Sequence, residues 1–263
     1  MATVSALRTH ADATIATGNA LELSGVSRRF GALQALDDVS LAVSAGERRA
    51  VIGANGAGKT TLFNVVTGDF PATAGFVRFF GDDVTTMPPY ERIRAGLRRT
   101  YQSSLLLRNL SVRDNLFLAV RGVARGRMSL LRPGADSTTR RAAEDLLLRV
   151  RLVDVADEPV AMLSHGQQRQ LEIGMALAGA PRLILFDEPA AGLSPAERRD
   201  LVALLNALPQ HIGFILIEHD LEIALTVVDR VTVLHNGRVL KEGTPDEIEN
   251  DAEVQEIYMG RRH

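Results

Sequence analysis

Gly53-Ala54-Asn55-Gly56-Ala57-Gly58-Lys59-Thr60 is the stretch of this sequence that decides its fold. Residues 48–52, which end in Val51-Ile52, precede it and predict a short buried strand, and residues 61–66 follow it and predict the start of a helix. The glycines let the backbone curl so that successive N–H groups point inward, and the helix start adds partial positive charge. A strand, a glycine-rich turn and a helix in this order predict a cradle for the phosphates of a nucleotide.

Lys59 and Thr60 separate this cradle from an ordinary glycine-rich turn, which would need the glycines but not the Lys-Thr pair. The chain has 30 lysines and arginines, and only Lys59 and Lys241 are lysines. A compact ammonium suits a point contact with a phosphate better than a forked guanidinium. We expect Lys59 to reach the β- and γ-phosphates of ATP and the Thr60 hydroxyl to bind Mg²⁺. The nucleotide-binding residues expected here are Gly53, Ala54, Asn55, Gly56, Ala57, Gly58, Lys59, Thr60 and Thr61.

The composition narrows the class of protein. At 263 residues, with 46% hydrophobic and 24% charged residues, the chain can bury a substantial core and is ordinary for a globular protein. The absence of cysteine excludes disulfides and thiol catalysis, and a net charge of −2 argues against a dedicated nucleic-acid binder. No apolar run approaches the roughly 18 residues of a membrane span, and no export signal is visible at the N-terminus. We therefore expect a soluble intracellular protein.

Strand and helix patterns alternate along most of the chain, which predicts an α/β fold with a parallel sheet covered on both faces. A helical segment at about 103–180 interrupts the alternation and indicates an inserted helical subdomain. We expect 1–18 to be a flexible extension, 19–263 one domain, and 244–263 its C-terminal tail. The expected strands are 21–23, 39–43, 48–52, 74–80, 183–186, 213–217, 231–234 and 239–240, with a loop at 28–31. The expected helices are 61–66, 140–150, 170–178, 195–207 and 221–228, and one that begins after Ser111 as N-cap.

An arginine-rich segment lies inside the helical region. Six arginines and one acid, Asp136, fall between Arg121 and Arg141. We interpret residues 121–137 as a loop. Two interpretations stay open: a solvated loop, or a contact with anionic lipid or an acidic partner surface.

Two acids follow the apolar strand pattern of Leu183 to Phe186. In a P-loop enzyme an acid at the end of a neighbouring strand, here Asp187, holds Mg²⁺, usually through water. The adjacent Glu188 can then polarise an attacking water molecule. Because this pair follows a P-loop, we expect it to be catalytic rather than an ordinary strand-end turn.

A third motif is Leu163-Ser164-His165-Gly166-Gln167-Gln168-Arg169. Ser164 is a good helix N-cap, and Gln167 stands at the third helical position, where a capping box places Glu or Gln. Free N–H groups at such a helix start can bind an anion. Alone, the motif is also compatible with an ordinary capped helix.

These motifs, in this order, resemble the ATP-binding subunit of an ATP-binding-cassette (ABC) transporter over about 21–243. Leu163-Ser164-His165-Gly166-Gln167 is similar to the Leu-Ser-Gly-Gly-Gln signature that separates this family from other P-loop NTPases. The resemblance implies a RecA-like core sheet, an N-terminal antiparallel β subdomain and an inserted helical subdomain.

The resemblance also implies roles for individual residues. Phe30 would stack on adenine, and Gln102 would lie near Mg²⁺ and the transmembrane partner. Asp187 would be the second Walker acid and bind Mg²⁺, Glu188 the catalytic base, and His219 the switch histidine on the γ-phosphate. Ser164, Gly166 and Gln167 would bind nucleotide from the opposite subunit of a head-to-tail pair. Two positions depart from the family pattern: His165 replaces a glycine, and Ser194 stands where many relatives carry an aspartate that crosses the dimer interface.

Longer stretches are similar to bacterial importers of branched-chain amino acids: 167–173, 187–195 and 217–220. Residues 98–102 resemble the larger of that system's two ATPases. Residues 253–260 are similar to the tail of that group, and also to the tails of urea or amide importers and of the lipopolysaccharide-export ATPase. We expect an amino-acid or amide importer, with lipopolysaccharide export as the alternative. An ABC ATPase of DNA repair or translation is a third class, which the single P-loop, single signature and short insert disfavour.

The resemblance implies partners and a location. The chain would sit peripherally on the cytoplasmic face of the inner membrane and bind transmembrane permease subunits. It would pair with a second ATPase subunit, identical or different, of which we favour the different one. A solute-binding protein would act indirectly, and no nucleic acid is expected.

Overall fold

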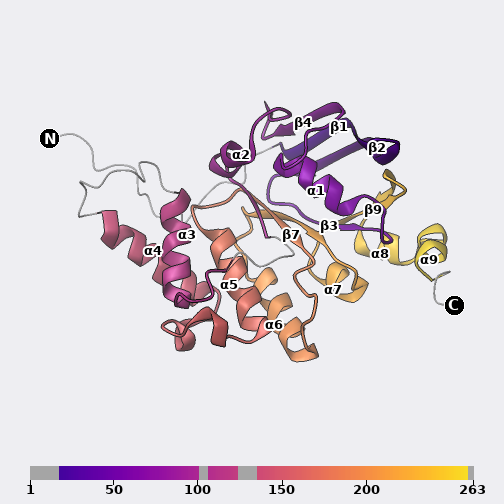
Figure 1. The fold of residues 1–263 in the computed structure, drawn as a ribbon. Helices are drawn as coiled ribbons and strands as arrows, with labels where there is room; N and C mark the ends of the chain where they lie inside the picture. The colour runs from indigo at the N-terminus through magenta and orange to yellow at the C-terminus, as the bar shows by residue number, and fades with distance from the viewer. Residues whose placement is uncertain (1–17, 101–105, 124–134, 260–263) are drawn as a thin grey trace.

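The computed structural model describes residues 18–100, 106–123 and 135–259 (Figure 1). Most of the described chain belongs to two sheets and the helices around them. The N-terminal extension expected at 1–18 lies outside the described residues, except for Gly18.

A six-stranded sheet forms the centre of the fold, in the order β10-β9-β3-β8-β7-β6. Neighbouring strands are parallel except for β10, which pairs antiparallel with β9 across the Asn236-Gly237 turn. The predicted parallel sheet is therefore confirmed. Its strands are β3 (Arg48–Ile52), β6 (Leu97–Arg99), β7 (Leu183–Asp187), β8 (Gly213–Ile217), β9 (Arg230–His235) and β10 (Arg238–Gly243).

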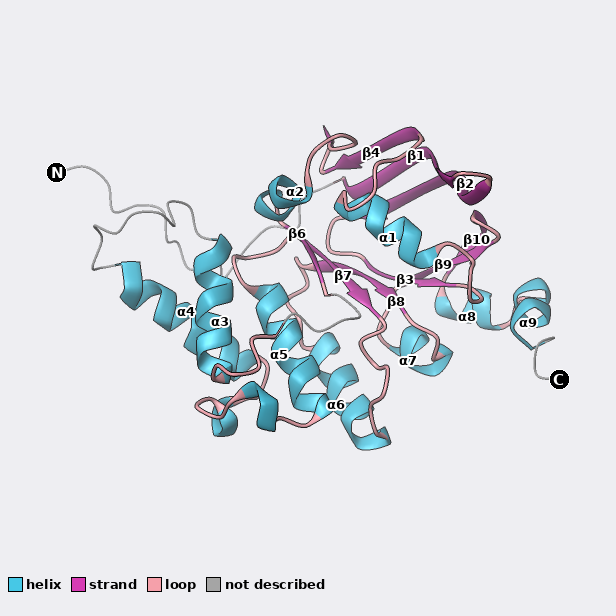
Figure 2. Cartoon of the chain, viewed as in Figure 1, coloured by secondary structure: helices cyan, strands magenta, loops and turns pink. Residues whose placement is uncertain are grey.

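A four-stranded antiparallel sheet lies above it in Figure 2, in the order β2-β1-β4-β5. Its strands are β1 (Asn19–Phe30), β2 (Leu33–Ser44), β4 (Ala74–Phe79) and β5 (Asp82–Asp83). The predicted loop at 28–31 is wrong, because β1 continues to Phe30, which pairs with Leu33. Register shifts along β1 and β2 break the regular alternation of apolar residues there, so the sequence pattern conceals the strand ends.

Helices cover both faces of the six-stranded sheet, with α1 on the side of the antiparallel sheet and α5 and α6 on the other (Figure 2). Ser111 caps α3, and its hydroxyl accepts a hydrogen bond from Asp114 N at 3.0 Å, as predicted. The helices are α1 (Lys59–Thr67), α2 (Pro89–Ala95), α3 (Val112–Val123), α4 (Ala135–Arg149), α5 (His165–Leu177), α6 (Pro195–Asn206), α7 (Leu221–Thr226), α8 (Pro245–Glu249) and α9 (Ala252–Met259).

The arginine-rich segment is not a loop at its ends. Residues 121–123 complete α3 and 135–137 begin α4, while 124–134 lie outside the described residues. The sequence around these helix ends is rich in glycine and arginine, and helix ends need no buried face, so they show no apolar periodicity that would predict a helix.

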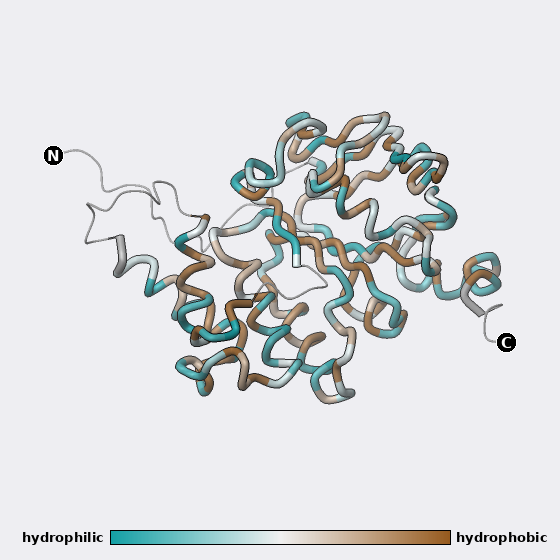
Figure 3. Tube along the Cα trace, viewed as in Figure 1, coloured by the Kyte–Doolittle hydropathy of each residue, from teal (hydrophilic) through white to brown (hydrophobic). Residues whose placement is uncertain are grey.

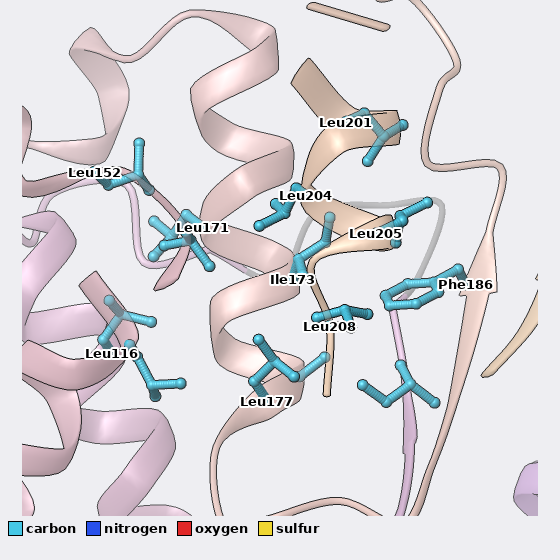
Figure 4. Packing of buried hydrophobic residues seen from close by; sticks show 14 of the residues in the cluster. Leu116, Leu152, Leu171, Ile173, Leu177, Phe186, Leu201, Leu204, Leu205 and Leu208 are labelled. Carbon is cyan, nitrogen blue, oxygen red and sulfur yellow. The ribbon is translucent and has the colours of Figure 1, made fainter. Parts of the chain in front are cut away.

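Strand β7 shows how the sheet divides the core. Leu183 and Leu185 pack with α1 and the antiparallel sheet, whereas Ile184 and Phe186 pack with the helical side. Figure 3 shows the resulting brown band through the sheet, and Figure 4 shows Phe186 beside Leu205 and Leu208 of the helical side. Because both faces are covered, the strand is a continuous apolar run with no alternation.

The C-terminal tail is part of the folded body up to Met259. Ile248 of α8 and Val254 of α9 are buried in a small cluster with Val231 and Val233 of β9. We propose that residues 19–259 act as one unit, with the helical subdomain inserted between β6 and β7.

Candidate nucleotide-hydrolysis site

The glycine-rich turn follows β3 directly and ends where α1 begins. Gly58 caps α1 with φ 105°, and a Cβ there would lie 2.6 Å from Ala35 O. A Cβ on Gly53 would lie 2.4 Å from Leu234 O. Both positions therefore require glycine, one for conformation and close packing and the other for close packing alone. Asn55 and Gly56 are exposed at the tip of the turn, with Ala54 beside them partly exposed.

Lys59 points back over this turn. Its Nζ donates to Gly53 O at 2.6 Å and to Ala54 O at 3.1 Å, and the residue is only 6% exposed. Burial lowers the pKa of Lys59, while the charges of Glu188 and Asp187 oppose that effect. The ammonium is thus hydrogen-bonded to the turn and close enough to the two acids predicted to be catalytic to interact with their charges. Thr60 is exposed in the first turn of α1, and Thr61 is half-buried.

Asp187 ends β7 and is 3% exposed. Arg99 Nη2 of the neighbouring strand β6 lies 2.7 Å from its Oδ2, and Arg99 Nη1 donates to Asn64 Oδ1 of α1 at 2.5 Å. The arginine therefore ties the end of β7 to the helix that follows the glycine-rich turn. Sequence analysis missed it, because the pairing of β6 with β7 is not visible in a local pattern.

Glu188 and His219 meet at the carboxyl ends of β7 and β8. His219 Nε2 lies 2.7 Å from Glu188 Oε1. They meet because β7 and β8 are parallel and Asp187 is in register with Ile217, so Glu188 lies one residue and His219 two residues beyond adjacent strand ends. Glu188 has φ 49°, a left-handed conformation that is uncommon outside glycine and often found at functional sites.

Glu218 is a second residue that sequence analysis missed. It is 4% exposed, and it accepts hydrogen bonds from Ala190 N at 2.7 Å and from His219 N at 3.2 Å. Burial raises the pKa of Glu218, an effect that these two bonds oppose. Its carboxyl braces the backbone after Glu188 against the backbone of His219. The sequence signal for Glu218 was an acid placed between the end of an apolar strand, Ile217, and the predicted site residue His219.

The predicted capped helix is confirmed at α5. Ser164 Oγ accepts from Gln167 N at 3.2 Å, and Gln167 Oε1 accepts from Ser164 N at 2.9 Å. His165 is the first helical residue and is exposed, so its substitution for glycine leaves the helix start regular. Ser194 has a local role as the N-cap of α6.

The structure brings one group of predicted residues together and keeps the other apart. Leu62 and Phe63 of α1 pack on one face of the central sheet, whereas Leu171 and Ile173 of α5 pack on the opposite face. Helices α1 and α5 are on opposite sides of the sheet in Figure 2 as well. Lys59, Asp187, Glu188 and His219 gather near the ends of β3, β7 and β8, while Ser164, Gly166 and Gln167 start a helix on the other layer.

Phe30 lies at the end of β1 and is 37% exposed. Its ring meets Phe70 edge-on at 5.4 Å between centroids, and the Arg28 guanidinium lies 4.4 Å from its centroid. Such a ring can stack on a base. Gln102 lies outside the described residues.

The residues present fit Mg²⁺ bound with a nucleotide. Magnesium in nucleotide sites takes one or two protein oxygens and completes its shell with phosphates and water. The Thr60 hydroxyl and the Asp187 carboxylate are oxygens of this kind. In the described ranges no cluster of three or more His, Asp or Glu side chains forms a metal cage by itself.

The sequence matches the family model for ABC transporters over residues 36–191. It is 35% identical over 248 residues to the "High-affinity branched-chain amino acid transport ATP-binding protein BraF" of Pseudomonas aeruginosa, covering 91% of this chain and 97% of that protein. It is 34% identical over 250 residues to the LivG protein of the same description from Escherichia coli K12, with the same coverage. A solved nucleotide-free ATP-binding cassette from an ABC transporter is 33% identical with TM-score 0.79, covering 91% of this chain and 98% of that one.

Proposed function

We propose that this chain, which belongs to the ATP-binding subunits of ABC transporters, hydrolyses ATP to power a membrane importer of branched-chain amino acids or similar small solutes. Membership makes it an ATPase of the ABC fold. The solute class rests on the names of relatives such as BraF and LivG. Small amides such as urea stay within the proposal. The observation that carries the chemistry is the 2.7 Å contact between Glu188 and His219.

In the proposed mechanism each of these side chains has a defined role. The backbone of 53–59 and the Lys59 ammonium bind the phosphates, and Phe30 stacks on the base. Thr60 and Asp187 would hold Mg²⁺, which would supply positive charge to neutralise the phosphates. Glu188 accepts a proton from the attacking water, and His219 holds Glu188 and contacts the terminal phosphate.

The proposed site is completed by a second subunit. Ser164 and Gly166 belong to a helix on the opposite layer of the same chain from α1. Their donors therefore suit the nucleotide of a facing subunit in a head-to-tail pair. We favour a different ATPase chain as that partner, on the family resemblance.

A cavity of about 210 Å³ between β6, α3 and α5 is the proposed contact for the permease. Arg99 and Thr100 line it, and the same two residues contact Asp187. An inserted permease segment would thus press on the strand that holds the predicted magnesium ligand. Ala119 and Met175 give the cavity an apolar wall.

The location follows from this partner. No helix in the described part of the chain is long and apolar enough to cross a bilayer. The subunit would be held at the cytoplasmic face of the membrane by its permease.

The test is uptake by proteoliposomes that contain the chain with its permease and partner ATPase. ATP inside the vesicles should drive accumulation of leucine when a solute-binding protein is present. Ser164→Arg should abolish uptake, and Ala119→Glu should reduce uptake more than ATP hydrolysis. ATP hydrolysis that is unaffected by Ser164→Arg would contradict the shared site, and export instead of uptake would contradict the importer.

A further inference from the structure

The start of α5 already holds an anion, the carboxylate of Glu197 from α6. Gly166 N donates to Glu197 Oε1 at 2.9 Å, and Ser164 Oγ donates to the same oxygen at 3.2 Å. These two donors are the ones proposed to receive the γ-phosphate of the facing subunit's ATP. A side chain of the same protein therefore occupies the position proposed for the γ-phosphate, which we call the phosphate seat.

The other oxygen of Glu197 belongs to its own helix. Oε2 accepts from Ser194 N at 3.0 Å and from Ser194 Oγ at 2.7 Å. Hydrogen bonds from the Ser194 backbone and hydroxyl, and from Gly166 N, lower the pKa of Glu197 to about 2. The group is thus a carboxylate at physiological pH. Capping α6 requires only the contact with Ser194, so the contact with α5 is additional.

A phosphate and this carboxylate cannot share the seat. One N–H makes one strong hydrogen bond, and two anions at hydrogen-bonding distance from the same donor repel each other. The packing is close, since a Cβ on Gly166 would lie 2.7 Å from Glu197 Oε1. An arriving phosphate oxygen must therefore displace Glu197 Oε1.

The carboxylate has space to withdraw. A cavity of about 90 Å³ lies beside it between α5 and α6 and is lined by Arg169, Gln170 and Asp200 among others. The Arg169 side chain is 18% exposed and pairs with Glu172 at 2.6 Å. A Glu197 side chain that rotates away from Gly166 can enter this cavity, whose wall carries the positive charge of Arg169 and the negative charge of Asp200.

We propose that Glu197 is an internal mimic of the γ-phosphate, and that it sets the ATP concentration at which the shared site closes. Glu197 is a positioning residue that competes with the terminal phosphate and takes no part in bond breaking. The inference rests on the proposed two-subunit site. ADP lacks the γ-phosphate, so its binding does not compete with Glu197.

The experiment uses the assembled transporter with Glu188→Gln, which slows hydrolysis, and measures half-saturating concentrations of ATP and ADP. Adding Glu197→Gln removes the charge and keeps the size. It should lower the ATP concentration at half-saturation about threefold to tenfold, which is the range that one hydrogen bond accounts for. The ADP concentration at half-saturation should not change. Glu197→Asp keeps the charge, but its shorter side chain cannot reach α5, so it should also lower the ATP concentration at half-saturation. The matched control is Glu247→Gln, which makes the same change in the capping box of α8 and should change the half-saturating concentration of neither nucleotide.

Three sets of results would overturn the role of Glu197. Equal shifts for ATP and ADP, or weaker ATP binding in both Glu197 variants, would show a merely structural role and overturn the inference. No shift in either variant would overturn it as well. If Ser164→Arg in the Glu188→Gln background leaves ATP half-saturation unchanged, the two-subunit site fails and the inference falls with it.

Discussion

Replacing Arg99 with methionine should lower the folding stability of the chain, because it breaks a buried ion pair beside the site. The Arg99 side chain is 5% exposed and that of Asp187 is 3% exposed, with 2.7 Å between Nη2 and Oδ2. Removing one partner of a buried ion pair leaves the other charge without its closest partner, which costs about 3 to 5 kcal/mol. At about 2 to 4 °C per kcal/mol for a chain of this size, the melting temperature should fall by about 6 to 20 °C.

The assay is thermal unfolding without nucleotide or Mg²⁺. Arg199→Met is the control, because Arg199 is exposed on α6 and its replacement should shift melting by less than 2 °C, on the order expected of a surface change. The double variant Arg99→Met/Asp187→Asn removes both charges and should recover a large part of the loss. A loss below about 1 kcal/mol, or a double variant no more stable than the single one, would refute the argument that the pair is a buried and mutually compensating unit.

Three further results should follow. Lys59→Ala should weaken ATP binding and abolish turnover, measured by nucleotide titration and phosphate release, and unchanged affinity would contradict its place over the phosphates. Phe30→Ala should weaken ATP binding by about 1 to 3 kcal/mol with little change in ligand-free melting, because the ring is 37% exposed; lost melting stability with normal affinity would identify a core residue instead. Burial raises the folded-state pKa of Glu218 above its ordinary 4.5, so the folded chain binds this proton more tightly and its stability should fall as pH rises from about 4.5 through the folded pKa. Glu218→Gln should flatten that decline in denaturant titrations between pH 4 and 8, and an unchanged slope would exclude Glu218 as its source.

Local patterns were enough to predict the glycine-rich turn and five of the six strands of the central sheet, all but β6. A buried parallel strand such as β7 is a continuous apolar run, and a turn that needs glycine and lysine at fixed spacing leaves a plain signal. Capped helices such as α5 are equally local, since Ser164 and Gln167 are three residues apart.

Contacts between distant segments were not predictable in this way. Arg99 pairs with Asp187 only because β6 lies beside β7, and β6 is three residues long with two arginines. The Ser194 to Glu197 spacing signals a helix cap, but nothing local indicates that the other oxygen of Glu197 reaches Gly166. Glu218 was passed over because an acid between apolar and polar residues has no meaning until its buried partners are known.

In the proposed mechanism Glu188, held by His219 at the ends of β7 and β8, removes the proton from the attacking water. Glu188→Gln in the assembled transporter tests it most directly, with ATP binding and single-turnover hydrolysis measured on the same preparation. We expect ATP affinity near that of the wild type and hydrolysis slower by about 10² to 10⁴-fold. Hydrolysis within a few-fold of the wild type, with ATP bound, would contradict it.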